Sequence, residues 1–267
     1  MTHYALIHDR DQVRQFFETH KARIFSSGGE TDDEVVAAPA KLSRGVLREE
    51  RVCLVQLCAR KKYAVELSRS ERIFERKLAE FDGSADGFLQ QLMRFEAPLG
   101  AYVESGTGVV VPQHAFALYM TLNPASTVDA FLHAERQIEE KLVEAARGHE
   151  VGVPSPFNLL FSACHTQAGG RFEKLDVDSK VDANIGALRA LFAAHAIVPE
   201  FVIESKNGFH VVLDNKASYK SKTGRKALLA FCEEHESWVR IEAKATHPSV
   251  VVPGTLQGGF RTNLVVW

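Results

Sequence analysis

The fold is decided by one stretch in the second half of the chain: Phe201-Val202-Ile203-Glu204-Ser205-Lys206-Asn207-Gly208-Phe209-His210-Val211-Val212-Leu213. Both ends of this stretch are mostly apolar, as is typical of β-strands, and the polar residues gather in the middle. Asn-Gly at 207–208 favours the tight turn of a β-hairpin, because both residues tolerate positive backbone φ angles. The stretch therefore predicts antiparallel strands at 201–204 and 209–213, joined by a turn.

Four further elements flank this hairpin. Residues 171–177 predict a strand, and 181–196 predict a helix with an apolar stripe. Downstream, 218–236 predict a helix and 238–242 a strand. The order strand-helix-strand-strand-helix-strand is that of ferredoxin-like and RRM-like folds, in which helices cover one face of the sheet and leave the other open. We therefore expect an RRM-like C-terminal module at 157–267.

The first half predicts an N-terminal α/β module at 1–156, so the fold class is α+β, with this module packed on the RRM-like one. Strands are expected at 51–59 and 116–122, and helices at 9–24, 70–81 and 126–147, the last capped by Ser126. The helical spacing of Phe88, Leu89, Leu92 and Phe95 indicates another core helix. Residues 26–33 predict a loop, and the stretch 151–156, with one glycine and two prolines, predicts the module boundary.

Composition excludes several classes of protein. The chain has 267 residues, 45% of them hydrophobic, which is too apolar for a disordered protein, and it has no run of 18 apolar residues that would span a membrane. Its formal net charge of −2 excludes nucleic-acid binding through overall charge, so such binding would need a local basic patch. The four cysteines lack zinc-finger spacing and predict buried, reduced thiols. We expect an intracellular protein, in cytoplasm or nucleus, that is not secreted.

Two aspartates carry the clearest chemical signal. In Leu175-Asp176-Val177-Asp178 the carboxylates stand two residues apart, so on a strand both point to the same face, and Leu175 and Val177 point to the helix-covered core. Neighbouring carboxylates repel each other unless a cation lies between them, and Mg²⁺ or Mn²⁺ prefers such oxygen ligands. The alternative is an ordinary solvated strand end.

His210 is expected to join the aspartates. In the predicted order the first and third strands are antiparallel neighbours, which brings His210 beside the Asp pair on the open face. A structural histidine is the alternative. Its position after a polar turn and opposite two carboxylates favours a role in holding a phosphate group of a nucleotide.

These segments together resemble the archaeo-eukaryotic primase superfamily. Leu175-Asp176-Val177-Asp178 is similar to its hydrophobic-Asp-hydrophobic-Asp motif, and the segment 205–210 is similar to its second motif, a polar turn that ends in His. Val252-Pro253-Gly254-Thr255-Leu256-Gln257 resembles the Pro-Gly-Thr/Ser segment that follows the third motif. The third motif itself usually supplies another acidic residue, and Glu242 is the candidate, although Asp is more frequent there. The match covers about 157–267.

The resemblance implies a template-dependent nucleotidyltransferase, a DNA or RNA primase-polymerase. Asp176, Asp178 and Glu242 would hold Mg²⁺ or Mn²⁺, and catalysis would rest on these residues and His210. Its partners would be nucleoside triphosphates, a single-stranded template and a primer, with a helicase or other replication proteins, in a cellular or viral setting and away from membranes. The expected nucleotide contacts are Ser205, Lys206, His210, Lys180 and Arg225.

Basic residues outside the motifs are candidates for contact with the nucleic-acid backbone. Arg60, Lys61 and Lys62 precede Tyr63, which could stack on a base. Lys220 and Lys222 belong to a basic run near the start of a helix, and Arg261 follows two glycines. Solvated surface patches are the alternative for all of them.

Three rival functions remain open. A catalytically degenerate primase-like module would bind nucleic acid without extending it. A metal-dependent phosphoesterase with an Asp nucleophile would need a parallel, doubly wound sheet, which the Asn-Gly hairpin argues against. An RRM-like binding module would need aromatic residues on the open face, where acidic residues are expected instead.

Overall fold

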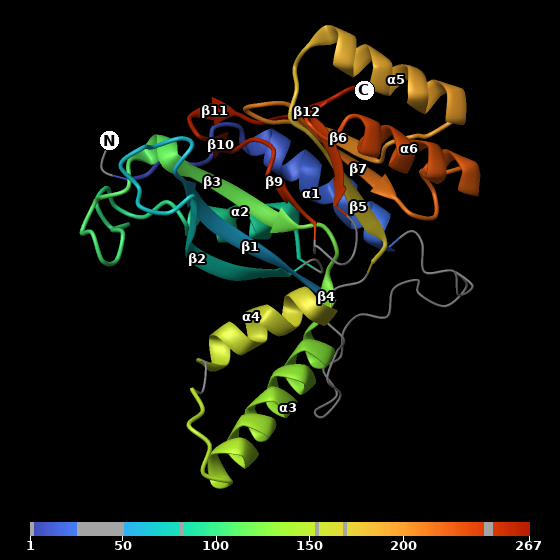
Figure 1. The fold of residues 1–267 in the computed structure, drawn as a ribbon. Helices are drawn as coiled ribbons and strands as arrows, with labels where there is room; N and C mark the ends of the chain where they lie inside the picture. The colour runs from blue at the N-terminus through green and yellow to red at the C-terminus, as the bar shows by residue number, and fades with distance from the viewer. Residues whose placement is uncertain (1–2, 26–50, 81–82, 153–154, 168–169, 243–247) are drawn as a thin grey trace.

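The computed structural model describes residues 3–25, 51–80, 83–152, 155–167, 170–242 and 248–267. Within these residues the protein is a mixed α+β structure with two antiparallel sheets that lie against each other (Figure 1). The expected α+β class is therefore confirmed. The loop expected at 26–33 and part of the boundary expected at 151–156 lie outside the described residues.

Within the described residues the first sheet has seven strands, four from the first half of the chain and three from its C-terminal part. Five strands follow the order β11 (Phe260–Arg261), β10 (Leu256–Gln257), β3 (Phe116–Thr121), β1 (Arg51–Arg60) and β2 (Glu71–Glu80). In addition, β9 (Ser249–Val251) pairs with β3, and β4 (Ala125–Ser126) pairs with β1. Helices α1 (Arg10–Phe25) and α2 (Ala85–Met93) pack on it. The side chain of Asp9 accepts hydrogen bonds from the backbone N–H groups of Asp11 and Gln12, which explains where α1 begins.

The strands of the second sheet have the order β12 (Asn263–Val265), β6 (Phe201–Glu204), β7 (Phe209–Asp214), β5 (Phe172–Val177) and β8 (Val239–Glu242). Its neighbouring strands are antiparallel. Helix α5 (Asp182–His195) follows β5, and α6 (Lys222–Glu234) follows β7. Both helices cover the same face of this sheet (Figure 1), over a core that includes Leu175, Val177, Leu188 and Leu228. The Asn-Gly hairpin and the neighbouring antiparallel strands agree with expectation, and they exclude the parallel sheet of the phosphoesterase alternative.

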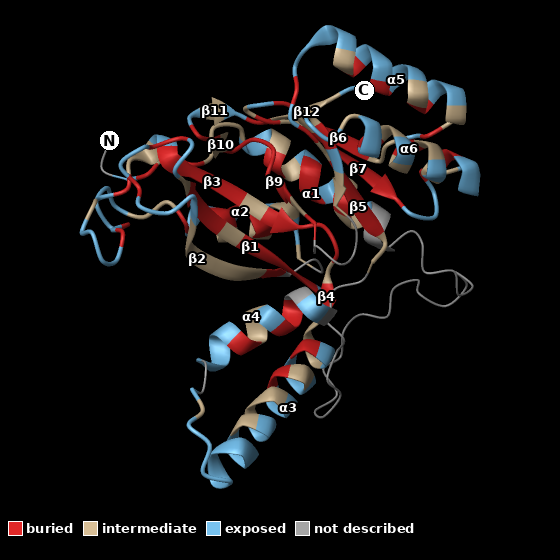
Figure 2. Cartoon of the chain, in the orientation of Figure 1, coloured by how far each residue is buried: buried red, intermediate tan, exposed pale blue. Residues whose placement is uncertain are grey.

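The other face of the second sheet is mostly covered, whereas the sequence predicted an open face. Phe172, Phe201 and Val212 pack in one large core with α1 and the first sheet. Figure 2 shows the buried residues running through the strands of both sheets. Large apolar side chains on this face need a covering layer, and helix α1 and the first sheet supply it.

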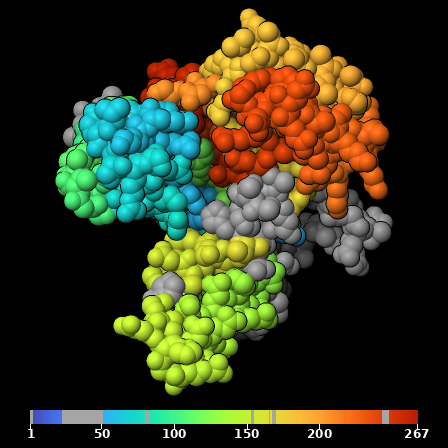
Figure 3. Space-filling view, viewed as in Figure 1, coloured from blue at the N-terminus to red at the C-terminus, as the bar shows by residue number. Residues whose placement is uncertain are grey.

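Two expectations about individual elements are wrong, and one helix was not expected. Residues 71–80 form strand β2, not a helix, and pair with β1 along its length. Helix α6 begins at Lys222 instead of 218, because Ser221 accepts a hydrogen bond from the Gly224 N–H and caps it. Helix α4 (Pro156–Gln167) was not predicted; with α3 (Thr127–Ala146) it forms a hairpin that projects from the body (Figures 1 and 3).

The expected module boundary after residue 156 does not separate the strands of the two sheets. Strands β9, β10 and β11 come from the C-terminal part but belong to the first sheet. Helix α4 packs on α3 and β1. The two sheets also share one core, so each half of the chain completes the other.

Candidate active site

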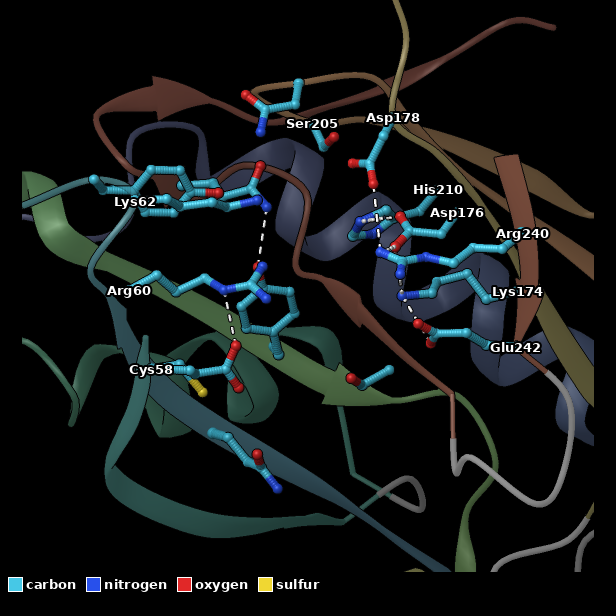
Figure 4. A pocket seen from close by; sticks show the side chains of 17 residues that line it. Cys58, Arg60, Lys62, Lys174, Asp176, Asp178, Ser205, His210, Arg240 and Glu242 are labelled. Carbon is cyan, nitrogen blue, oxygen red and sulfur yellow. Dashed lines mark hydrogen bonds and ion pairs between the residues drawn. The ribbon is translucent and has the colours of Figure 1, made fainter. Parts of the chain in front are cut away.

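A polar cavity of about 240 Å³ lies between the two sheets. One wall comes from the first sheet: β1, the segment after it, the start of β2, and single residues of β3, β9 and β10. The other wall comes from β5, the β6–β7 turn, β7 and β8 (Figure 4). The space-filling view shows a hollow between the cyan residues of the first sheet and the orange-red residues of the second (Figure 3). The lining side chains relevant to chemistry are Arg60, Lys62, Glu71, Tyr119, Lys174, Asp176, Asp178, Ser205, His210, Arg240, Glu242 and Gln257.

Asp176 and His210 face each other across neighbouring strands. They are direct partners in the β5–β7 register, and His210 Nε2 lies 3.5 Å from Asp176 Oδ1. His210 Nδ1 accepts a hydrogen bond of 3.2 Å from the backbone N–H of Val251 on β9. Burial, together with the nearby Lys174 charge, lowers the pKa of His210 to about 3. The imidazole is therefore neutral near pH 7, and its proton is on Nε2, which lines the cavity.

Arg240 bridges the two aspartates. Its Nη2 lies 3.6 Å from Asp176 Oδ2 and 3.4 Å from Asp178 Oδ2. Burial is the largest influence on the pKa of Asp176 and acts to raise it, but Lys174 and Arg240 are among the charges that outweigh burial and lower this pKa. Asp176 is therefore ionised at neutral pH. Two carboxylate oxygens thus converge on a single cationic atom.

Glu242 is held apart from this pair by a buried lysine. Lys174 Nζ lies 3.0 Å from Glu242 Oε2 and 4.0 Å from Asp176 Oδ2. In the strand register Glu242 is opposite Lys174, and Arg240 is opposite Asp176. Over the part of the chain that the structure describes, no three His, Cys, Asp or Glu side chains are gathered as a metal site would need.

Two of the three expected metal ligands, Asp176 and Asp178, lie where they could hold a divalent cation. Asp176 Oδ2 and Asp178 Oδ2 already bracket the positively charged nitrogen of Arg240, and carboxylate oxygens suit Mg²⁺ and Mn²⁺. The Arg240 side chain is 65% exposed, so it can leave this position without unpacking the core. The expected third ligand, Glu242, does not join the pair in this arrangement.

The opposite wall is basic and aromatic. Arg60 pairs with Glu71 at 2.8 Å and donates a hydrogen bond of 3.2 Å to the Tyr119 hydroxyl. Lys62 also lines the cavity, and burial together with Arg60 lowers its pKa. Figure 4 shows Arg60 and Lys62 across the cavity from the aspartates.

The β6–β7 turn fits closely on the end of β5. A Cβ at Gly208 would lie 1.7 Å from the backbone oxygen of Val177, so only glycine allows this contact. The turn carries Ser205 and Asn207 into the cavity wall. Lys206 lies beside the cavity instead: its Nζ donates to the Gly258 carbonyl oxygen at 2.6 Å and stands 4.6 Å from the centre of the Tyr63 ring.

Several other predicted contact residues lie outside the cavity lining. Lys180 pairs with Glu204 at 2.6 Å and lies over the ring of Phe260. Arg225 on α6 pairs at 3.0 Å with buried Glu173, so it belongs to the helix-covered side of the second sheet. The remaining members of this group are exposed on the surface: Lys61, Lys220, Lys222 and Arg261.

Sequence reasoning missed the roles of Lys174, Arg240 and Gln257. Lys174 stands two residues before Asp176, so strand alternation alone places it on the same face. Arg240 shares a face with Glu242 for the same reason. Gln257 lies in the segment quoted for the family resemblance; its Oε1 accepts from the Lys206 backbone N–H at 2.7 Å, and its Nε2 donates to Tyr119 at 3.1 Å. Only the structure shows that this segment returns to the cavity.

No protein-family model, curated protein or solved structure matches this chain. Among the described residues, none of the helices combines the length and apolar character needed to cross a lipid bilayer. All four cysteines, Cys53, Cys58, Cys164 and Cys232, are buried and unpaired with each other, as the sequence predicted.

Proposed function

We propose that this protein is a metal-dependent nucleotidyltransferase of the archaeo-eukaryotic primase type, which adds nucleotides along a single-stranded template. One observation carries the proposal: two carboxylate oxygens, from Asp176 and Asp178, converge on one cationic atom beside a neutral His210. The order β8-β5-β7-β6, with both helices on one face, supports the RRM-like arrangement that this family would require.

In this proposal Asp176 and Asp178 hold Mg²⁺ or Mn²⁺. When bound, the metal would neutralise charge on the triphosphate and lower the pKa of the attacking 3′-hydroxyl. His210 contributes its Nε2–H as a neutral donor for a phosphate oxygen, because its other nitrogen is engaged by Val251. Arg60 and Lys62 face the aspartates and provide positive charge for the phosphates of the nucleotide or the template.

The position of the cavity supports a role for both sheets. A nucleotide held by Asp176 and His210 would have Tyr63 and Tyr119 on the first-sheet side for stacking or sugar contact. The single-stranded template and primer would approach from outside the cavity, where Lys61 is exposed. An intracellular setting with replication partners follows from the same proposal.

A primer-extension assay tests the proposal. Labelled nucleotides are incubated with Mn²⁺ or Mg²⁺ and a single-stranded template, with and without an annealed primer. We expect template-dependent incorporation by the wild type and a loss of at least about a thousandfold in the double variant Asp176→Asn/Asp178→Asn. Equal incorporation by the two proteins would place the chemistry elsewhere.

A second candidate, a catalytically degenerate module, is favoured by one observation. The Lys174–Glu242 pair removes the third carboxylate that the family would supply. Such a module would bind nucleotide or single-stranded nucleic acid and yet incorporate nothing with either metal. Binding measured alongside the extension assay distinguishes the two candidates.

A further inference from the structure

Each carboxylate of the cavity lining that the structure describes already has a cation as its partner. Arg240 lies between Asp176 and Asp178, and Lys174 lies against Glu242. Glu71, the fourth acidic residue of the lining, is paired with Arg60. Among the described residues, the lining contains four acidic residues, Asp176, Asp178, Glu242 and Glu71, and four basic residues, Arg60, Lys62, Lys174 and Arg240. The charges of this described lining therefore nearly balance before any ligand enters.

This balance disfavours either charged ligand on its own. A divalent cation that enters alone must compete with Arg240 for the two aspartates and leave that guanidinium without its partners. A triphosphate that enters alone must draw Arg240 away. Asp178 then loses its ion-pair partner, and Asp176, whose side chain is 16% exposed, keeps only the more distant Lys174 at 4.0 Å. If both ligands arrive together, the cation binds the two aspartates that Arg240 leaves, and the phosphates bind Arg240. No charge is then left unpaired.

The two bridging cations differ in mobility. The Arg240 side chain is 65% exposed, whereas the Lys174 side chain is 7% exposed and lies between Glu242 and Asp176. A long exposed side chain can change rotamer at small cost, while moving the buried lysine would separate it from both Glu242 and Asp176. Arg240 is therefore the group that can exchange partners, and Lys174 stays in place.

We propose that the site binds a preformed complex of a divalent cation with a nucleoside triphosphate, and that Arg240 moves from the aspartate pair to the phosphates when this complex enters. This inference rests on the proposed function, because it assumes the same metal and nucleotide site. It adds that Arg240 opposes metal binding in the free protein and supports nucleotide binding in the complex.

The test measures binding, not turnover. Mn²⁺ binding to the protein alone is followed by the loss of the free-Mn²⁺ electron paramagnetic resonance signal. Binding of a fluorescent, non-hydrolysable nucleoside triphosphate is followed by anisotropy, with EDTA or with Mn²⁺. Both titrations are run on wild type, Arg240→Gln and Asp178→Asn.

For the wild type we expect weak binding of Mn²⁺ alone, weak binding of the nucleotide in EDTA, and binding at least about tenfold tighter when Mn²⁺ and nucleotide are present together. Arg240→Gln should bind Mn²⁺ alone on the order of tenfold more tightly and the Mn²⁺–nucleotide complex more weakly. Asp178→Asn should bind Mn²⁺ poorly in both cases.

Arg14 offers a matched control, because it also bridges two aspartates, Asp11 at 2.7 Å and Asp86 at 2.8 Å, on an exposed surface. Arg14→Gln makes the same change of charge and should leave Mn²⁺ and nucleotide binding unchanged. An equal gain in Mn²⁺ binding in Arg14→Gln would show that the effect is not specific to the cavity and would overturn the inference.

Two further outcomes separate this inference from the proposed function. Wild type could bind Mn²⁺ alone as tightly as Arg240→Gln does, while nucleotide binding still requires Asp178. In that case the proposed movement of Arg240 is wrong, but the proposed metal site at the aspartates is kept. If neither Mn²⁺ nor nucleotide binds to any of these proteins in any combination, the proposed function itself fails.

Discussion

The side chain of Asn123 forms two hydrogen bonds with the backbone of Phe172. Its Nδ2 donates to the Phe172 carbonyl oxygen at 2.9 Å, and its Oδ1 accepts from the Phe172 N–H at 2.8 Å. Asn123 follows β3 of the first sheet, and Phe172 begins β5 of the second. This pair therefore connects the two sheets, and β5 is the strand that carries Asp176 into the cavity between them.

Replacing Asn123 should weaken the connection between the sheets. Asn123→Ala leaves the buried N–H and C=O of Phe172 without these partners, and we expect the free energy of unfolding to fall by about 2–4 kcal/mol. Urea denaturation followed by tryptophan fluorescence measures the change. Asn215→Ala is the control, since Asn215 bonds to the Gly170 carbonyl from an exposed position and should cost under about 1 kcal/mol. Similar losses in both variants would contradict a special role for Asn123.

Gly208 should not tolerate even a methyl group. The Cβ of alanine there would lie 1.7 Å from the Val177 carbonyl oxygen, so the β6–β7 turn would have to move away from β5. We expect Gly208→Ala to lower the free energy of unfolding by at least about 2 kcal/mol and to weaken nucleotide binding, because Ser205 and His210 flank this turn. Denaturation and nucleotide anisotropy measure the two effects.

Gly186 on α5 is the matched control for this substitution. A Cβ there meets nothing within 4 Å, and glycine inside a helix is less favourable than alanine. Gly186→Ala should therefore raise the free energy of unfolding by about 0.5–1 kcal/mol. If Gly208→Ala behaved like Gly186→Ala, the close contact between the turn and β5 would be incorrect.

Strands β5 to β8 of the second sheet were predictable from the sequence because their signals are local, whereas β12 was not predicted. The Asn-Gly turn fixes the hairpin, and alternation on β5 directs Leu175 and Val177 to the helices and Asp176 to the other face. The juxtaposition of Asp176 and His210 follows from these facts and the strand order. The acidic pair and the histidine can therefore be placed together from the sequence alone.

The remaining features depend on contacts between distant parts of the chain. Residues 71–80 contain many good helix formers, but pairing with β1 outweighs this local preference. Arg225 meets Glu173 only because α6 packs on β5, and Gln257 reaches the cavity only because β10 joins β3 of the first sheet. The Lys174–Glu242 pair depends on the register between β5 and β8, which spacing along the chain does not reveal.

The Lys174–Glu242 pair should be energetically coupled. Lys174→Met leaves Glu242 without its ion-pair partner and removes one of the positive charges near Asp176, so we expect a loss of about 2–4 kcal/mol in the free energy of unfolding. Adding Glu242→Gln should recover part of that loss, with a coupling energy on the order of 1–2 kcal/mol in the double-mutant cycle. Urea denaturation of the four proteins measures it.

The Lys180–Glu204 pair serves as the reference cycle. Both side chains are about one-third exposed, so solvent screens their attraction, and their coupling energy should be under about 1 kcal/mol. Equal coupling in the two cycles would mean that the buried position of Lys174 confers no additional interaction.

His20 should make the protein sensitive to mild acid. It is fully buried, donates from Nε2 to the Leu122 carbonyl oxygen at 2.9 Å, and is surrounded by Phe16, Phe172 and Phe201. Burial lowers the pKa of His20 from 6.5 to about 4. Below pH 6.5 the unfolded chain takes up a proton that the folded protein does not, so stability is lost as the pH falls toward 4. The loss attributable to His20 is roughly 2 kcal/mol at pH 5.

Urea denaturation at pH 7, 6 and 5 tests this dependence. His20→Phe gives up the hydrogen bond to Leu122 and so starts from a lower free energy of unfolding at pH 7, but its decline between pH 7 and pH 5 should be smaller than that of wild type by roughly 2 kcal/mol. His133→Phe, on the projecting helix α3, makes the same replacement outside this aromatic core and should keep the wild-type decline. A His20→Phe curve parallel to that of wild type would show that other groups cause the loss of stability in acid.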